Sequence, residues 1–268
     1  MTEISVVVAT YDRPDALRAV LTSLTAQTYE PFSVTVADDG STDATKRVIE
    51  ELGGSTATAF RHVWQPDEGP RKSTVLNKAI IETPADYLIF IDGDCLVRPD
   101  FVRSHAKLAE SGRFVRGSRI MIGESLTTEI LGGRVAAHEW SAGRWLAHRL
   151  RGRIDRASPL FRLPLGPTRL LRGRKWKGVK GCNVAAWRDD LLAIGGFEEE
   201  IAGPGPEDVD LALRLIRYGV RRKEGRYAVP VLHLWHPERS ADPENERVFE
   251  ERLRSRGFRA TRGLEPQA

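Results

Sequence analysis

Short apolar runs alternate with helical patterns along the first 122 residues, and this alternation limits the fold more than any other feature. Runs rich in β-branched residues predict strands at residues 4–9, 32–37, 59–64, 87–91 and 114–122. Apolar residues at helical spacing predict helices at residues 15–26, 41–52, 73–82 and 99–110. Strands that alternate with helices form parallel sheets with right-handed crossovers. We therefore expect an α/β fold with a mostly parallel central sheet and helices on both faces.

The alternation stops near residue 123. Apolar residues at near-i+4 spacing between residues 131 and 150 predict an amphipathic helix, which Gly132 and Gly133 weaken. Residues 151–177 are rich in Arg, Pro and Gly and predict a mobile loop. Later patterns predict helices at residues 188–194, 207–218 and 244–256, and an interrupted strand pair at 227–234. We interpret the chain as one continuous domain, made of a half at 1–122, a basic amphipathic insert at 123–177 and a half at 178–268 with a small antiparallel part.

Positive charge is concentrated in one segment. Residues 144–180 contain twelve Lys or Arg and one acid, so the segment carries a net charge of +11, whereas the other 29 basic and 36 acidic residues sum to −7. Such a patch attracts phosphate on a membrane surface, an anionic glycolipid or a nucleic acid. Its aromatic residues, Trp145, Phe161 and Trp176, are too sparse to stack a row of bases, which argues against nucleic acid.

The sequence also bears on location. No window approaches the roughly 18 apolar residues of a membrane span, and the N-terminus lacks the pattern of a signal peptide. Cys95 and Cys182 make no disulfide framework, so we expect a cytoplasmic protein. Trp140 and Trp145 beside the basic segment indicate peripheral attachment at the inner face of the plasma membrane. A solvated loop that orders over the substrate is the alternative.

Three polar clusters follow predicted strands, in the stretches that begin at Thr10, Asp38 and Asp92. In parallel sheets ligands bind outside the carboxyl ends of the strands, so we expect the clusters at one edge. Asp92 and Asp94, one residue apart, repel each other unless a cation lies between them. Carboxylates that follow a strand at the ligand-binding edge suit a hard divalent cation such as Mg²⁺, and Gly93 allows close backbone approach. A simple strand-end turn is the alternative.

For the other charged residues, the sequence allows both a ligand-binding role and a purely structural one. Asp38 and Asp39 are placed to accept hydrogen bonds from a base or ribose, or to form a turn in front of a helix. Arg71 and Lys72 open a predicted helix, where cations are disfavoured unless an anion such as a diphosphate binds, although a solvated helix end is the alternative. A second helix begins at Glu207-Asp208, which suits a general base or mere complementation of the helix dipole.

The remaining candidates are His233, His236 and Asn183. One histidine is placed to add a metal ligand beside Asp94, and a hydrogen-bonded core histidine is the alternative. Asn183 suits sugar hydroxyls or a buried turn. There is no P-loop, no GxGxxG after a strand and no GxSxG elbow, so the corresponding enzyme classes are not indicated.

Five stretches occur in a characteristic order: ISVVVATYDRP, VTVADDGSTD, KSTVLNKAI, YLIFIDGDCLVRPDF and GCNVAAWRDDLLAIGGFEEE…GPEDVDLALRL. Together they resemble the inverting glycosyltransferases of family 2, which have the GT-A fold, a Rossmann-like mostly parallel sheet. The resemblance spans about residues 3–122 and 178–237, and its last stretch is similar to galactosyl- and N-acetylgalactosaminyltransferases. Segment 124–177 matches no pattern and leaves the acceptor open.

The resemblance implies a role for each candidate. It implies a catalytic base at Asp208 with Glu207 beside it. The nucleotide would be bound by Thr10, Tyr11, Asp12, Arg13, Asp38, Asp39, Arg71, Lys72, Asp92 and Gly93. The Mn²⁺ or Mg²⁺ ion would be held by Asp94, Asp92, His233 and His236. The donor or acceptor sugar would be bordered by Asn183, Cys182, Gly196 and Phe197.

The implied activity is metal-dependent, inverting transfer of a sugar from a nucleotide-diphosphosugar, with UDP favoured, to a hydroxyl of a glycan, glycolipid or lipopolysaccharide-type acceptor. Two alternatives are kept. A nucleotidyltransferase would carry a Gly-rich basic loop after the first strand, where this chain has ATYDRPD. A non-catalytic glycan- or nucleic-acid-binding module would bind through the basic segment alone. The oligomeric state is left open.

Overall fold

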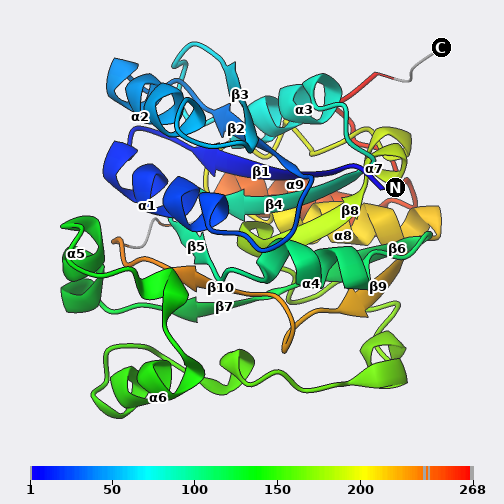
Figure 1. The fold of residues 1–268 in the computed structure, drawn as a ribbon. Helices are drawn as coiled ribbons and strands as arrows, with labels where there is room; N and C mark the ends of the chain where they lie inside the picture. Colours follow the sequence, from blue (N-terminus) through cyan, green and yellow to red (C-terminus); the bar gives the residue numbers. More distant parts are fainter. Residues whose placement is uncertain (1, 238–239, 241, 266–268) are drawn as a thin grey trace.

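The computed structural model of the chain describes residues 2–237, 240 and 242–265. Within these residues a large sheet carries helices on both faces, and a smaller sheet lies beside it (Figure 1). The large sheet has seven strands in the order β3-β2-β1-β4-β8-β6-β9. Their bounds are β1 (Ile4–Thr10), β2 (Ser33–Asp38), β3 (Ala59–Trp64), β4 (Tyr87–Asp92), β6 (Arg113–Arg116), β8 (Val184–Trp187) and β9 (Arg221–Glu224).

The large sheet is mixed only at β8. The strands β1, β2, β3 and β4 pair in parallel, β8 runs antiparallel to both β4 and β6, and β6 is parallel to β9. The strands β6 and β9 therefore point the same way as β4, and their carboxyl ends reach the same edge of the sheet. The predicted α/β class with a mostly parallel sheet is confirmed.

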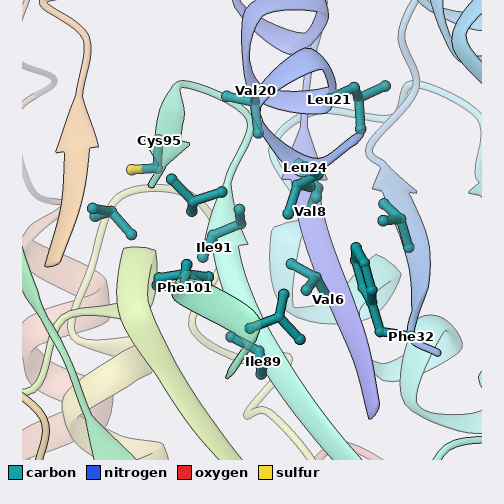
Figure 2. Close-up of a cluster of buried hydrophobic side chains, with 14 of the residues drawn as sticks. Val6, Val8, Val20, Leu21, Leu24, Phe32, Ile89, Ile91, Cys95 and Phe101 are labelled. Atoms are coloured by element: carbon teal, nitrogen blue, oxygen red, sulfur yellow. The ribbon is translucent and has the colours of Figure 1, made fainter. Parts of the chain in front are cut away.

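The strands β1, β2 and β4 are mostly apolar because both faces of the sheet are covered there, whereas the edge strand β3 is mostly exposed or half-buried. Alternate residues of β1 point into two cores: Val6 and Val8 into one, and Val7 and Ala9 into the other. The first core lies under α1 (Pro14–Thr25), α2 (Asp43–Gly53) and α4 (Phe101–Leu108), and Figure 2 shows its side chains gathered between β1, β4 and α1. The second core lies under α3 (Lys72–Glu82), α7 (Arg188–Ala193) and α8 (Glu207–Tyr218).

The smaller sheet consists of β5 (Cys95–Val97), β10 (Pro230–His233) and β7 (Ser118–Met121), in that order. It is mixed, because β10 is antiparallel to β5 and parallel to β7. The single strand predicted at residues 114–122 is wrong in one respect: it is two strands, β6 and β7, in different sheets. The chain changes sheet at Gly117, where a Cβ atom would overlap the side chain of Asn183.

The C-terminal third also differs from the prediction. The expected strand pair at 227–234 is the one strand β10, and the strand β9 at Arg221–Glu224 was missed because it is short and charged. The helix α8 begins and ends where it was predicted, and α9 (Pro243–Arg254) follows near the end of the chain. Among the residues that the structure describes, no helix has the length and apolar character needed to cross a membrane.

The insert is folded against the smaller sheet. The single amphipathic helix predicted there is wrong: α5 (Glu124–Leu131) ends at the glycine pair, and α6 (Ala142–Leu150) begins after the short 3₁₀ helix η1 (Ala137–Glu139). Trp140 is 6% exposed and Trp145 is fully buried in a third core, so neither can reach a membrane. The predicted loop contains the 3₁₀ helices η2 (Ser158–Leu160) and η3 (Gly166–Leu170), and Ile154 and Leu160 hold its first part in the same core.

Candidate active site

The carboxyl ends of β1, β2 and β4 lie side by side at one edge of the large sheet. Thr10 is in register with Asp38, and Ala9 with Asp92. The backbone N–H of Asp39 donates to the Thr10 carbonyl at 3.0 Å, and that of Gly93 donates to the Ala9 carbonyl at 2.6 Å. A Cβ atom at Gly93 would come within 2.9 Å of the Thr10 hydroxyl, so the approach requires glycine. The structure thus brings together the three clusters that the sequence placed at this edge.

On the β2 side of the edge, both carboxylate oxygens of Asp39 accept a hydrogen bond. Its Oδ1 accepts from Gln65 Nε2 at 2.6 Å, and its Oδ2 accepts from the backbone N–H of Arg71 at 2.8 Å. Burial raises the pKa of Asp39, against the opposing effect of these hydrogen bonds. Beside it Tyr11 is 42% exposed and donates its hydroxyl to Asp67 at 2.9 Å. Sequence reasoning missed Gln65 and Asp67, which no local motif marks.

Asp38 and Asp12 are occupied by contacts within the protein. Asp38 is 1% exposed, contacts His62 Nε2 at 2.9 Å and accepts the backbone N–H of Ser41 at 2.9 Å. Asp12 accepts the Thr42 hydroxyl at 2.8 Å. These contacts fasten the loops after β1 and β2, which is the turn reading of the pattern. A nucleotide role for either carboxylate stays a prediction that this geometry does not favour.

Lys72 joins the two halves of the chain at the centre of the edge. Its Nζ lies 2.6 Å from Asp92 Oδ1 and 3.6 Å from Glu207 Oε1. Burial lowers the pKa of Lys72, but attraction to the two carboxylates outweighs that effect and the pKa is raised overall. Burial likewise raises the pKa of Asp92, and the neighbouring Lys72 cation more than reverses it. Lys72 therefore stays charged, and one cation serves two acids.

Glu207 and Asp208 form the first turn of α8. Asp208 Oδ2 accepts the backbone N–H of Gly181 at 2.6 Å. Burial raises the pKa of Glu207 to about 7, and burial also raises that of Asp208. Carboxylates with raised pKa values suit general bases near neutral pH. Beyond this turn α8 packs into the core, because Leu211 and Leu215, one and two turns after Asp208, are fully buried.

Asp94 is surrounded by one guanidinium group and two imidazole rings. Arg13 Nη1 is 3.3 Å from Asp94 Oδ2, His236 Nε2 is 3.5 Å from the same oxygen, and His233 Nε2 is 3.6 Å from Oδ1. In both histidines Nδ1 lies 2.8 Å from a backbone carbonyl oxygen, which assigns the proton to Nδ1. Each Nε2 lone pair is then left to face the carboxylate.

These separations fit a divalent cation. Two ligands held about 2.1 Å from one cation at roughly right to tetrahedral angles lie about 3 to 3.5 Å apart. Cys95 Sγ also lies close, 3.8 Å from Asp94 Oδ1, and with Asp94 and His233 it forms a group whose ligand atoms are all within 4.8 Å of one another. A thiol is a soft ligand, and burial raises the pKa of Cys95. The carboxylate and imidazoles therefore suit Mn²⁺ or Mg²⁺ better than the thiol does.

The four residues expected to border a sugar are buried. Asn183 is fully buried and donates Nδ2 to the carbonyls of Ser118 and Val229 at 3.0 and 2.5 Å. Cys182 and Phe197 are 3% and 1% exposed, and the backbone N–H of Phe197 donates to Asn77. Gly196 is buried and follows Gly195 in the same turn. This geometry favours the buried-turn reading of Asn183 and gives none of the four a surface for a sugar.

Known proteins share both the sequence pattern and the architecture. Residues 5–162 match the model of glycosyl transferase family 2, and residues 172–234 match the model of the N-terminal domain of galactosyltransferase. Validoxylamine A glucosyltransferase of Streptomyces hygroscopicus subsp. limoneus is 27% identical over 237 residues, covering 81% of this chain and 48% of the relative. Hyaluronan synthase of Pasteurella multocida is 26% identical over 226 residues, covering 81% of this chain and 23% of the relative. The chain thus spans about half or less of these relatives.

Solved structures agree on the fold. The mannosyltransferase PcManGT of Pyrobaculum calidifontis, in complex with GDP-Man and Mn²⁺, has a TM-score of 0.58 at 19% identity and covers 90% of this chain and 59% of that one. TarS 1-349 of S. aureus in complex with UDP has a TM-score of 0.57 at 16% identity, covering 88% and 61%. The GT-A architecture expected from the resemblance is confirmed. With more than half of its length matching the family model, the chain belongs to glycosyltransferase family 2.

Proposed function

We propose that this chain is the catalytic domain of a metal-dependent, inverting glycosyltransferase. It would move a sugar from a nucleotide-diphosphosugar, UDP-linked in the first instance, to a hydroxyl of a glycan or lipid-linked acceptor. The observation that carries the proposal is the single edge at which Asp94 with its two histidines, the Lys72 bridge and Asp208 all meet. Residues 1–122 would supply the donor side, and residues 178–268 the base.

The donor side follows from the contacts at β1 and β2. Asp39 is held in place by Gln65 and Arg71, which orients its carboxylate toward the edge where a ribose or base would bind. Tyr11 offers an exposed ring beside it. Asp94, His233 and His236 would hold the cation, with Asp92 close by on Lys72. When bound, the Mn²⁺ or Mg²⁺ ion would act as a Lewis acid on the diphosphate of the donor.

The transfer itself would be one displacement. The acceptor oxygen forms a bond to the anomeric carbon, the bond from that carbon to the diphosphate oxygen breaks, and the electron pair leaves with the diphosphate. Asp208 takes the hydroxyl proton of the acceptor, and its raised pKa suits that role. Lys72 holds Glu207 and Asp92 in place on either side. A single displacement inverts the anomeric centre and needs no carboxylate nucleophile, in contrast to a retaining glycosidase.

The test is a screen of sugar nucleotides with Mn²⁺, read as thermal stabilisation and as release of nucleoside diphosphate. We expect a UDP- or GDP-linked sugar to stabilise the protein and to be slowly hydrolysed, and both effects to disappear in Asp94→Ala. Asp189→Asn, an exposed acid on α7, is the matched control and should behave like wild type. Release of pyrophosphate from a nucleoside triphosphate and a sugar phosphate would instead identify the nucleotidyltransferase. Unchanged hydrolysis in Asp94→Ala would contradict the metal role.

Peripheral attachment to an anionic membrane and a cytoplasmic location also stay proposals. The basic charge of the insert supports attachment, whereas Trp140 and Trp145 are buried and cannot act as membrane anchors. Flotation with anionic vesicles in low salt tests it, because a protein that binds through charge should float and should be released as salt screens the contact.

A further inference from the structure

A strongly basic cavity of about 280 Å³ is lined by residues other than those assigned above, and two of them, Arg119 and Lys180, lie close enough for their charges to favour the ionised forms of Asp92 and Asp208. Nine lysines and arginines and a single acid, Glu224, line it. Only part of this charge comes from the basic segment of the sequence. Arg116, Arg119 and Arg222 come from the strands β6, β7 and β9, which the fold brings to the same place. Its volume suits a small group such as a diphosphate and is at the lower end for a whole ligand.

The floor of the cavity includes Arg222, Glu224 and Arg116, and both arginines contact the acid. Arg222 is 2% exposed and donates Nη1 to the carbonyls of Lys175 and Lys177 at 3.0 and 3.1 Å. Its Nη2 lies 3.0 Å from Glu224 Oε2, while Arg116 Nη1 lies 3.2 Å from Oε1 of the same acid. Two arginines therefore share one carboxylate, which leaves a net positive charge on the floor. Arg222 Nε is buried without a hydrogen-bond partner among the described residues.

The rim is exposed and its charge is not balanced. Arg172, Lys175, Lys177 and Lys180 are exposed side chains at the mouth of the cavity. Within the described part of the chain none of them is in an ion pair, nor is Arg119 on the floor. Like charges gathered this closely repel one another, so the arrangement favours a bound anion. Phosphate groups match this lining, because guanidinium groups bind phosphate oxygens in a bidentate fashion.

The position of the cavity shows which substrate could reach it. Along the sheet edge the order runs from Asp39 after β2, through Thr10 and Asp92, to the ends of β6 and β9 at Arg116 and Glu224. The cavity is thus on the side opposite the proposed nucleotide contacts. It still adjoins the reaction centre, because Lys180 on its rim directly precedes Gly181, whose N–H binds Asp208.

We infer that this cavity binds a phosphate or diphosphate group carried by the acceptor. The inference rests on the proposed function and adds the chemical class of the acceptor: a glycan or lipid-linked sugar that bears phosphate near the hydroxyl to be glycosylated. A planar membrane surface fits less well, because the floor cations lie on strands at the base of a cavity. The donor diphosphate would lie on the Asp94 side and does not require these residues.

The experiment titrates inorganic pyrophosphate into the full chain with EDTA present, followed by calorimetry, so that a metal-dependent donor site is silent. The test variant is Arg172→Gln/Lys175→Gln/Lys177→Gln, and the matched control Arg149→Gln/Arg151→Gln/Arg174→Gln removes three exposed charges of the same segment that do not line the cavity. We expect pyrophosphate to bind about tenfold more weakly to the test variant and within about twofold of wild type to the control. Arg119→Gln, a single change on the floor, should weaken binding in the same direction.

Three outcomes overturn the inference. Equal loss in both triple variants shows diffuse charge, and pyrophosphate binding that appears only when Mn²⁺ replaces EDTA shows binding at the donor side. Binding of phosphatidylglycerol vesicles that depends on the rim, without pyrophosphate binding, identifies a membrane contact instead. Hydrolysis of the sugar nucleotide with Mn²⁺, measured on the two triple variants, should stay at the wild-type rate. If that hydrolysis is absent from wild type as well, the proposed function fails, whatever the pyrophosphate result.

Discussion

Two charged clusters lie along the helix α8, and they are built on different principles. The first surrounds Glu207 and Asp208 at the start of the helix, where Lys72 bridges to Asp92. The second lies one turn further on, where Arg214 Nε is 2.7 Å from Asp210 Oδ2 and both side chains are fully buried. Arg252 reaches the same Asp210 at 3.3 Å and also pairs with Glu198.

The difference lies in the charge balance. In the second cluster two arginines face two acids, and Arg214 also donates to the carbonyls of Ile194 and Gly196 at 3.0 and 2.7 Å. This network balances its charges within the protein and fastens α9 to α8, although Arg214 Nη2 has no hydrogen-bond partner among the described residues. In the first cluster Asp92, Glu207 and Asp208 surround one lysine, and the excess negative charge faces the sheet edge. A cluster that is unbalanced in the free protein is a place for a ligand or a proton to be taken up.

The largest expected effect comes from breaking the first cluster. Asp208→Asn removes the proposed base while keeping the shape of the side chain, so we expect the transfer rate to fall about 10²- to 10⁴-fold. Steady-state kinetics with the sugar nucleotide and an accepted glycan measures it. The midpoint of urea unfolding should not fall, since the buried carboxylate is costly. A transfer rate within about threefold of wild type would mean that Asp208 is not the general base.

Breaking the second cluster should lower the free energy of unfolding and leave the activity of the folded protein unchanged. Asp210→Ala leaves Arg214 buried without its carboxylate, and removal of one partner from a buried pair costs about 3–5 kcal/mol. The free energy of unfolding in urea measures the loss. Glu244→Gln, which breaks an exposed pair with Arg247, is the control and should leave the unfolding curve where it is. A stable but inactive Asp210→Ala protein would mean that the two clusters are not separate.

The pH dependence of stability tests the electrostatics of the first cluster. Burial raises the pKa of Glu207 from its usual 4.5 to about 7, so the folded state holds this proton more tightly than the unfolded chain does. The resulting stabilisation is complete below about pH 4.5 and is lost as the pH rises to about 7. Glu207→Gln cannot titrate, so its stability relative to wild type should increase across that range and then level off. Urea unfolding at several pH values measures this, and a constant difference would contradict the raised pKa.

The smallest expected effect is at Tyr11, which follows β1 at the same edge of the sheet. Tyr11→Phe removes the hydroxyl that donates to Asp67 but keeps the exposed ring, so the KM for the donor should rise by no more than about threefold. Tyr11→Ala also removes the ring and should raise that KM about tenfold if a base stacks on it. Donor-saturation kinetics of the two variants measures the difference. Equal donor KM values for the two variants would show that the Tyr11 ring does not contact the donor.

The features predicted best from the sequence are those that local residue patterns determine. The strands β1, β2 and β4 were found because burial on both faces makes each a mostly apolar run, and the edge strand β3 was found although most of its residues are exposed or half-buried. The convergence of Asp39, Asp92 and Asp94 followed from the rule that ligands bind at strand ends. The short strands β5, β7 and β9 were missed or merged, because three or four residues carry little periodic signal.

Features that depend on contacts between distant segments could not be predicted from the sequence. Trp140 and Trp145 looked like membrane anchors, but the smaller sheet offers them a core. Gln65 orients Asp39, and Lys72 joins Asp92 to Glu207, through pairings that no spacing in the chain shows. The basic cavity likewise needs arginines of β6, β7 and β9 to meet the segment that looked basic by itself.

The central claim is that the acids of this sheet edge hold one cation for the donor diphosphate. Anomalous diffraction from crystals grown with Mn²⁺ and UDP tests it most directly. The account predicts one manganese peak within bonding distance of the Asp94 carboxylate and His233 Nε2, next to the diphosphate. A diphosphate bound in the basic cavity with no metal at Asp94, or manganese bound away from Asp94, would contradict it.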